Sequence, residues 1–511
     1  MKKLIISLFT LSVLFSGCDL DEDPPFLSEY DIYNDADNIR AALDAVYAGM
    51  VSYNNYGARH QFVSGLYSGY MVTRRGGQGL QSPDNALLAS LTPTSGDGYS
   101  EGLWFGTYTV IARANNIIQN AAPVDTLSAP DPSDQMPENE DLLIINDVIG
   151  QAYFIRAFSY YNLIGLWGEV PLRLVPATSE DISLAKSSKV EIYGQIIRDC
   201  QQALKYMNGV AGDHYPKTYA ANMLLAKVYM LMATDEVKID ETANYWQLAY
   251  DEAIKIKDKY KLIGSYENLF IDPTSDNNSE SIFELQMSQS IENFLARDYG
   301  PRRYINGVSF GWLKVNADFY QLHFDQYPGD PRLTATYIYT YDGRPGGNAY
   351  PLNKKRDVFD NAHPTLFKFA IKNRNSTINF TNQNVVVFRY AELLLMLAEI
   401  SNELNNGEQL GYVTEVLDRV GQTPPSAYSG NQEEFRAAIM REYQFELLGE
   451  GNDAINVRRR GYDWFKANII DLHNNNPLFS SVVDVKLAEG EEVVMKLPIP
   501  SAEINSNSKI N

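Results

Sequence analysis

Cysteine and histidine are scarce in this sequence. Among 511 residues there are two cysteines, and the five histidines are scattered along the chain. A disulfide framework is therefore excluded unless the two cysteines pair. The sequence contains no HExxH, C-x-x-C or EF-hand pattern, so we expect no metal site and no cofactor. The residues concerned are Cys18, Cys200, His60, His214, His323, His363 and His473.

Basic charge and long apolar runs are also lacking. The 43 Lys and Arg residues are outnumbered by 64 Asp and Glu residues, which gives a formal net charge of −21. This charge repels phosphate backbones, so nucleic acid is not an expected partner. No run of about 18 apolar residues is present, so we expect no membrane-spanning segment. The 45% of hydrophobic residues is typical of a globular protein with a sizeable core.

The first residues, MKKLIISLFTLSVLFSGC, have the pattern of an export signal. Two lysines are followed by an apolar segment, and two small residues precede Cys18. The stretch LFSGC resembles the bacterial lipobox, in which the cysteine becomes the first mature residue and carries acyl chains. We therefore predict a signal peptide over residues 1–17 and lipidation of Cys18. The alternative is a plain signal peptide with an incidental cysteine.

The segment after Cys18 is acidic. Four acidic residues and then two prolines come shortly after it. Such a segment cannot pack into a core, so residues 18–30 are predicted to form a solvated tether. An acidic stretch at this place resembles the signal that sends lipoproteins of Bacteroidetes to the outer face of the outer membrane.

Most of the remaining chain has the three- and four-residue apolar spacing of helices. Segments 142–168 and 390–404 each carry two apolar stripes, so we expect both helices to lie between other helices. Segments 218–233 and 243–256 have the spacing of a tetratricopeptide-like hairpin. The chain is therefore predicted to be mostly α-helical, with stacked hairpins. Further helices are predicted at residues 38–53, 103–121, 189–207, 408–421 and 433–451.

Three long stretches interrupt the helices, at residues 64–103, 264–310 and 326–385. They are rich in Gly, Pro, Asn and Tyr, and they are too long to be simple connectors. We therefore expect these irregular stretches to bind ligand. Short β-strands are predicted in SIFELQM, ATYIYTY and NVVVFRY, without a prediction of their pairing.

Several motifs resemble those of the SusD/RagB family of outer-membrane lipoproteins of Bacteroidetes. The most specific are the LWG-x-VPL turn and the RYAE helix, and the likeness spans almost the whole chain. The motifs are AYFIRAFSYYNLIGLWGEVPL (152–172), NNSESIFELQ (277–286), GDPRL (329–333), VVFRYAELLLMLAEISNEL (386–404), IMREYQFELLGEGNDAINVRRRG (439–461) and LPIPSAEINSNSKIN (497–511).

This resemblance implies a mostly helical fold over residues 31–511. The tetratricopeptide-like hairpins would lie mainly within residues 105–260 and 386–425, wrapped by the irregular stretches. It also implies a role: the protein would capture oligosaccharide or polysaccharide at the cell surface and deliver it to a SusC-like TonB-dependent transporter, while its lipid holds it on the outer membrane. Most characterised relatives bind glycans and a minority bind peptides, so a peptide-binding, RagB-like role is the alternative.

A glycan site needs flat aromatic rings for the C–H faces of sugars and polar groups beside them. Tyr and Phe within helices are expected to serve packing instead. The predicted ligand-binding residues therefore lie in two irregular segments, SGLYSGYMVTRRGGQGL and RDYGPRRYINGVSFGW. They are Tyr67, Tyr70, Arg74, Arg75, Tyr299, Arg303, Tyr304 and Trp312, with Arg302 beside them.

Charged and tryptophan residues of the helical motifs are interpreted as structural. Buried charge pairs more often fix packing geometry than perform chemistry. The charged residues are Arg156, Arg389, Glu392, Glu399, Arg441, Glu446 and Arg458, and the tryptophans are Trp104, Trp167, Trp246 and Trp464.

One motif has a catalytic appearance, because residues 307–311 read GVSFG and fit G-x-S-x-G. A nucleophile elbow needs a core strand before the serine and a helix after it. The preceding GPRRYIN is too polar and too broken by Gly and Pro for such a strand, so we predict a binding protein and no enzyme. Two alternatives stay open: a surface glycan hydrolase, whose paired carboxylates need no sequence motif, and an assembly or adhesion lipoprotein.

Overall fold

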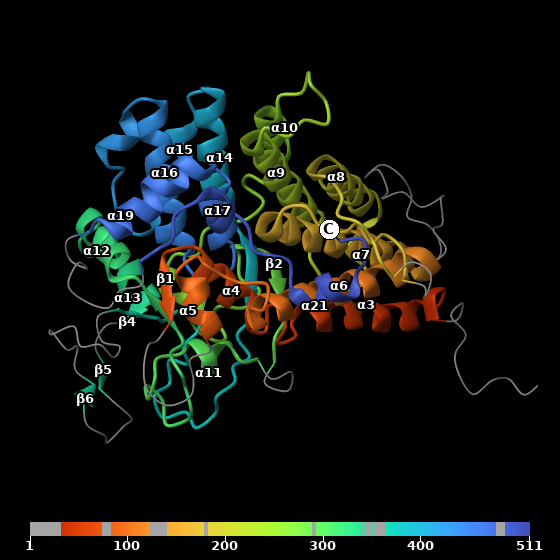
Figure 1. Ribbon diagram of the computed structural model, residues 1–511, viewed down its shortest axis with the longest axis horizontal. Coiled ribbons are helices and arrows are strands. Elements are labelled where there is room, and N and C mark those ends of the chain that lie inside the picture. The colour runs from red at the N-terminus through yellow and green to blue at the C-terminus, as the bar shows by residue number, and fades with distance from the viewer. Residues whose placement is uncertain are drawn as a thin grey trace, which may run out of the picture.

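The computed structural model describes residues 32–73, 83–121, 140–177, 182–288, 293–338, 341–342, 349–350, 363–476 and 486–510. Within these ranges the chain is mostly helical, with a few short strands (Figure 1), which confirms the predicted fold class. No helix in this part of the chain is long and apolar enough to cross a bilayer. The predicted signal peptide, Cys18 and the tether of residues 18–30 lie outside the described residues.

The helices form an ordered array. Helices α6, α7, α8, α9, α10 and α14 pack one against the next along this order, and α14 also packs against α15 and α16. The longer helices are α3 (Ala36–Met50), α4 (Arg59–Tyr67), α6 (Gly98–Asn120), α7 (Glu140–Trp167), α8 (Lys189–Tyr206), α9 (Thr218–Asp235), α10 (Tyr245–Ala253), α12 (Ala317–Gln326), α14 (Tyr390–Leu404), α15 (Gln409–Arg419) and α16 (Gln432–Leu447).

Shorter helical pieces lie mainly in the irregular stretches and towards the C-terminus. They are α5 (Pro83–Ala89), η2 (Tyr266–Phe270), α11 (Leu295–Tyr299), α13 (Pro331–Thr336), η4 (Ser426–Ser429), α17 (Asp453–Arg458), α18 (Tyr462–Phe465), η5 (Lys466–Ile470), α19 (Asp471–Asn474), α20 (Glu491–Val494) and α21 (Ser501–Ser506). The η5 segment is a π-helical turn that joins α18 to α19 without a break.

Helix α7 lies at the centre of the array because it is apolar on two faces. Both predicted stripes are buried, one containing Ile144 and Val148 and the other containing Phe154 and Phe158. Phe158 makes edge-on contacts with Phe283 and Phe388, at centroid distances of 5.5 Å each. The same holds for α14, whose two stripes are also buried. The prediction that both helices lie between other layers is therefore confirmed.

The strands are short and belong to three small sheets. The strands β2 (Ser281–Leu285) and β8 (Val385–Arg389) form an antiparallel pair under the helices, with Glu284 opposite Val386. A four-stranded sheet has the order β1-β3-β7-β4, and β5 pairs with β6. The remaining strands are β1 (Met71–Thr73), β3 (Leu313–Val315), β4 (Tyr337–Ile338), β5 (Tyr341–Asp342), β6 (Ala349–Tyr350) and β7 (Thr365–Leu366). All three predicted β segments contain a strand.

Charged residues of the motif helices make buried contacts. Arg156 on α7 binds Asp199 on α8 through two hydrogen bonds of 2.8 and 2.7 Å. Glu392 pairs with Lys227, and Glu399 pairs with Arg459 and Arg460. These pairs join one helix to another or, for Arg459 and Arg460, to the turn after α17, which supports their structural interpretation.

Arg441 and Arg458 differ from this pattern, because they donate to neutral oxygen atoms. The Arg441 guanidinium donates to the side-chain oxygen of Gln326 at 3.3 Å. Arg458 donates to the backbone carbonyls of Ala454 at 3.0 Å and Val494 at 2.8 Å. Its guanidinium also lies 3.7 Å from the ring centroid of Tyr67.

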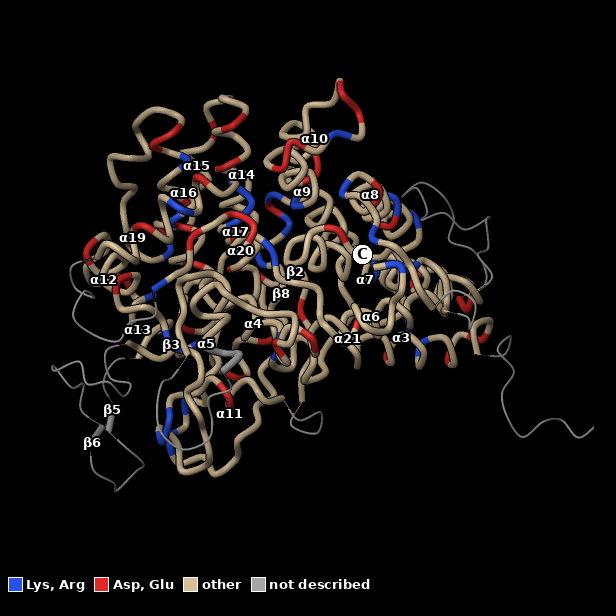
Figure 2. Tube along the Cα trace, in the orientation of Figure 1, with Lys and Arg blue, Asp and Glu red and all other residues tan. Residues whose placement is uncertain are grey.

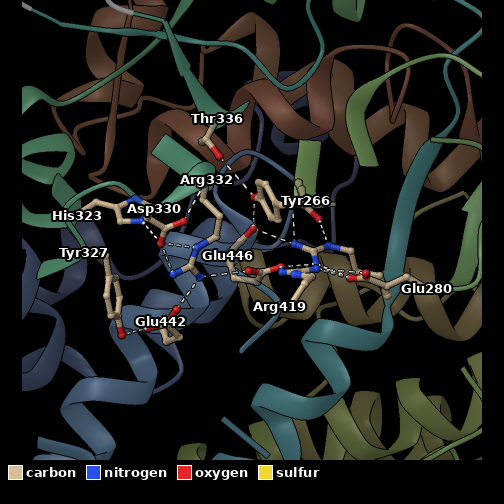
Figure 3. A network of polar contacts seen from close by, with 12 residues as sticks. Tyr266, Glu280, His323, Tyr327, Asp330, Arg332, Thr336, Arg419, Glu442 and Glu446 are labelled. Atoms are coloured by element: carbon tan, nitrogen blue, oxygen red, sulfur yellow. Dashed lines mark hydrogen bonds and ion pairs between the residues drawn. The ribbon is translucent and has the colours of Figure 1, made fainter. Parts of the chain in front are cut away.

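A buried ionic network ties the irregular stretches to α14, α15 and α16 (Figure 3). Glu446 on α16 lies between three guanidinium groups: Arg389 at 2.6 Å, Arg332 at 3.2 Å, and Arg419. Arg389 also binds Glu280 and Glu450, each at 2.7 Å. Burial disfavours the charged form of Glu446, but the three arginines outweigh burial and hold its pKa well below its usual range.

This network anchors two of the irregular stretches. Arg332 lies in the first turn of the short helix α13 in the stretch 326–385, and Glu280 lies just before β2 in the stretch 264–310. Both are fully buried. These two irregular stretches are therefore fixed to the helical scaffold by charge-assisted hydrogen bonds that would be costly to break.

Candidate functional site: an aromatic face beside α11

The irregular segments gather around α11, at the lower edge of the molecule in Figure 1. There, side chains from five separate segments form a partly exposed group of rings and guanidinium groups. We call this group the aromatic face. It consists of Tyr53, Arg59, Tyr99, Phe294, Arg297, Phe310, Trp312 and Phe380, each of which is partly exposed.

Arg297 on α11 holds one side of the aromatic face. Its guanidinium carbon lies 4.0 Å from the ring centroid of Phe294 and 5.6 Å from that of Phe310. The Nε group donates to the Oδ1 atom of Asp298 at 2.7 Å. Phe294 in turn meets Tyr53 and Phe380 edge-on, at 5.2 and 5.3 Å. The carboxylate of Asp298 therefore fixes a cation between two rings.

Arg59 lies at the other side of the aromatic face. Its guanidinium carbon lies 5.6 Å from the ring centroids of both Tyr53 and Tyr99, and its Nη1 donates to the carbonyl oxygen of Gly98 at 2.7 Å. Tyr99 stacks on the buried ring of Phe62 at 4.6 Å. Phe62 also contacts Trp312 edge-on at 6.3 Å, so the contacts close into a circuit.

Phe310 and Trp312 form a stacked pair, with centroids 5.0 Å apart and an interplanar angle of 10°. Their backbone is fixed to α11. The backbone amide of Phe310 donates to the carbonyl oxygen of Arg297 at 2.7 Å, and the backbone amide of Trp312 donates to the carbonyl oxygen of Asp298 at 2.8 Å. Gly311 between them has φ +62°, and a Cβ there would lie 3.2 Å from a backbone nitrogen. Glycine is therefore favoured at the position that pairs the two rings.

This arrangement suits a ligand with apolar faces and polar edges. The rings offer π-surface, and the guanidinium groups offer hydrogen-bond donors beside it. Burial, with Asp298 and Tyr99 adding to it, raises the pKa of Tyr53 to about 12, so its phenol stays neutral at physiological pH. Figure 2 shows further Lys and Arg residues in the loops beneath α11. Such a surface can stack a sugar ring and bind its hydroxyl groups.

The structure places the predicted ligand-binding residues in different environments. Trp312 belongs to the aromatic face, and Arg303 and Tyr304 lie in the loop after α11, exposed and partly exposed respectively. Tyr304 lies beneath the Arg374 guanidinium, at 5.1 Å. Arg74 and Arg75 lie outside the described residues. Ligand binding by these residues stays a prediction.

Three of the predicted ligand-binding residues are buried, whereas stacking on a sugar requires an exposed ring. Tyr67 is 0% exposed and packs against Arg458, and Tyr299 is 1% exposed and donates to the carbonyl of Ala58. Tyr70 is 8% exposed and lines a separate pocket beside α12. Their rings are covered by neighbouring side chains: Tyr67 by Arg458, Tyr70 by Phe319 and Tyr299 by Phe62.

Sequence reasoning missed most of the aromatic face. Arg297 and Phe310 lay inside the segment RDYGPRRYINGVSFGW but were not selected. Tyr53 follows α3, and Tyr99 lies in the first turn of α6, where aromatic residues are expected to pack. The alternation Phe-Gly-Trp was the available signal, because a glycine between two aromatics allows both rings to pack together.

Two chemical alternatives find no support in the described residues. The Ser309 hydroxyl donates to the carbonyl of Pro301 at 2.7 Å, in a loop with no strand before it and no helix directly after it. This is not the geometry of a nucleophile elbow. Within the described ranges, no group of three His, Cys, Asp or Glu side chains could hold a metal ion.

The other tryptophans and Cys200 are packing residues. Trp104 is fully buried and meets Trp167 edge-on at 5.4 Å. The indole of Trp167 donates to the carbonyl of Pro498 at 3.2 Å, which connects the LWG turn to the C-terminal motif. Burial raises the pKa of the Cys200 thiol well above its usual value.

Comparisons with known proteins agree along the whole chain. Residues 279–511 match the model described as SusD family, and residues 21–230 match one described as starch-binding associating with outer membrane. The SusD-like protein P2 of Formosa agariphila is 26% identical over 540 residues, covering 100% of this chain and 99% of that protein.

Solved structures show the same fold. A SusD superfamily protein from Bacteroides vulgatus has a TM-score of 0.72 at 21% identity, over 94% of this chain and 99% of that one. Surface glycan-binding protein A from Bacteroides fluxus has a TM-score of 0.67 at 21% identity, over 92% of this chain and 96% of that one. With both family models matched, in the N-terminal and C-terminal parts of the sequence, the chain belongs to the SusD/RagB family.

Proposed function

We propose that this protein captures a glycan on its aromatic face and passes it, uncleaved, to a SusC-like TonB-dependent transporter. The observation that carries the proposal is the group of partly exposed rings and guanidinium groups around α11, which the buried ring of Phe62 joins into a circuit. Sugars bind proteins through just these two kinds of contact, stacking on rings and hydrogen bonding to polar groups.

Membership of the family supports the same function. One matched model is described as starch-binding and associated with the outer membrane, and one structural neighbour is a surface glycan-binding protein. The transporter partner and the lipid anchor at Cys18 are inferred from the family resemblance and from the LFSGC motif. In this account the protein binds and positions the glycan, and bond cleavage is left to other proteins.

Affinity electrophoresis through gels that contain single polysaccharides tests the proposal. We expect at least one neutral polysaccharide to retard the protein. Phe310→Ala and Trp312→Ala should each weaken that retention about two- to tenfold, because losing one stacked ring costs about 0.5–1.5 kcal/mol.

Phe324→Ala is the matched control, since Phe324 is 44% exposed on α12 and is not part of the aromatic face. Its retention should equal that of the unsubstituted protein. Retention that is unchanged in both aromatic-face variants, with the fold intact by circular dichroism, would reject the aromatic face as the capture site. Release of reducing sugar from the retained polysaccharide would reject binding without cleavage.

A further inference from the structure

A second cavity lies at a different place, between α12 and the continuous α18–η5–α19 segment. Its volume is about 180 Å³. Helix α12 and helix α19 lie next to each other in Figure 1, at the side of the molecule away from α8. The residues before β1 close one end of the cavity, through Gly69 and Tyr70.

Helix α12 supplies one polar wall. Asp318, Gln321 and Asp325 are spaced three and four residues apart, so they share one face of the helix, and all three line the cavity. The amide nitrogen of Gln321 donates to Asp325 Oδ1 at 2.7 Å. This bond fixes both side chains and leaves the other oxygen of the carboxylate available for a ligand.

The opposite wall comes from the π-helical turn and α19. Asn468 lies in the turn and His473 in α19, and both line the cavity. The Nδ1 atom of His473 lies 2.6 Å from Asp318 Oδ2, which fastens the two walls together. A π-helical turn changes the direction of the side chains that follow it, and such turns occur frequently at functional sites.

Apolar groups complete the cavity. Phe319 and Leu472 line it, and the ring of Tyr70 meets that of Phe319 at a centroid distance of 4.4 Å. The cavity thus combines carboxylate, amide and imidazole groups with hydrocarbon walls, as sugar sites do. Drug-sized ligands occupy cavities of about 300 Å³ or more, so this one has room for a single ring and not for an oligomer.

The charged groups of the cavity determine which kind of sugar ring it can bind. Two of its lining residues are aspartates, and none of the described residues that line it is Lys or Arg. Sugar hydroxyls can donate to the carboxylates, and a ring amine would gain a charge-assisted bond. Asp318 is already paired with the imidazole of His473, so the carboxylate of Asp325 is the group that would repel a ring carrying a carboxylate or sulfate.

The cavity is separate from the aromatic face. Trp312 directly precedes β3, whereas Asp318 lies three residues after its end. A strand rises about 3.3 Å per residue, so the span from 312 to the start of α12 covers roughly 15 Å. We propose that this cavity is a second binding site, which takes one pyranose-sized polyhydroxylated ring that is neutral or carries an amine, and which rejects anionic rings.

Ligand-observed saturation-transfer NMR on the full protein tests this site, with glucose, glucosamine and glucuronate as probes. We expect signals from glucose and glucosamine and none from glucuronate. Leu472→Trp should fill the cavity and abolish the signals; Leu472 is 47% exposed, so the larger side chain can be accommodated. Asp325→Asn should weaken glucosamine about tenfold more than glucose, because it removes only the charge.

Two controls separate this site from the aromatic face. Leu410→Trp places the same substitution at a position that is 41% exposed on α15, and it should leave the signals unchanged. Trp312→Ala should also leave them unchanged. Signals that survive Leu472→Trp, signals that disappear in Trp312→Ala, equal binding of glucuronate, or no binding of glucose and glucosamine would each overturn the second site. Adding Trp312→Ala to Leu472→Trp shows where surviving signals arise: their loss in the double variant assigns them to the aromatic face, so the second site fails while the proposed function stands.

Discussion

Arg389→Met is expected to lower the free energy of unfolding by about 3–5 kcal/mol, the usual cost of removing one partner from a buried ion pair. Arg389 is 2% exposed and binds the carboxylates of Glu280, Glu446 and Glu450. Methionine fills much of the space but supplies no charge. The variant therefore leaves three buried carboxylates to share the remaining cations, Arg332, Lys368 and Arg419.

Urea unfolding followed by tryptophan fluorescence measures this loss as a lower midpoint. Arg40→Met is the matched control, because Arg40 forms an ion pair with Asp37 that is 3.5 Å long and exposed to solvent. Exposed pairs contribute about 0–1 kcal/mol, so its midpoint should barely move. Equal midpoints for Arg389→Met and the unsubstituted protein would contradict the role given to the network.

Cys18→Ala is expected to release nearly all of the protein from the outer membrane. Each buried acyl methylene contributes about 0.8 kcal/mol, and one chain alone gives only reversible binding, so stable anchoring depends on several chains. All of them depend on the modification of Cys18 that the LFSGC motif predicts.

Membrane fractionation combined with palmitate labelling measures this effect. Cys200→Ala is the matched control, since Cys200 is the other cysteine and is buried in α8. It should remain labelled and in the membrane fraction. Labelled protein in the membrane fraction of the Cys18→Ala variant would show that the anchor is elsewhere.

The helices were predictable because their signals are local. The double apolar stripes of α7 and α14 follow from spacing alone, and burial on both faces is the only way to remove both stripes from water. The strands β2 and β8 were likewise visible as short β-branched and aromatic runs. Their pairing was not, because residues 281 and 389 are far apart in sequence.

The aromatic face was harder to predict because exposure of a loop residue is decided by tertiary packing. Tyr67 and Trp312 both lie in glycine-rich stretches and look alike in sequence. Tyr67 is the last residue of α4, and its ring packs against the guanidinium of Arg458. Trp312, in contrast, is held at the surface by a hydrogen bond from its backbone amide to the backbone carbonyl of Asp298. The ionic network was hard to predict for the same reason, because tertiary packing brings together Glu280 and Arg389, which are 109 positions apart in the sequence.

Location of the glycan on the aromatic face is the central claim, and tryptophan fluorescence tests it most directly. A titration with an oligosaccharide of the retained polysaccharide should change the emission of the unsubstituted protein and of Trp246→Phe, whose indole lies on α10 beside Arg460. Trp312→Phe keeps an aromatic ring for stacking but removes the reporter. We expect this variant still to bind the oligosaccharide and to lose the emission change; an unaltered emission change in Trp312→Phe would place the glycan elsewhere.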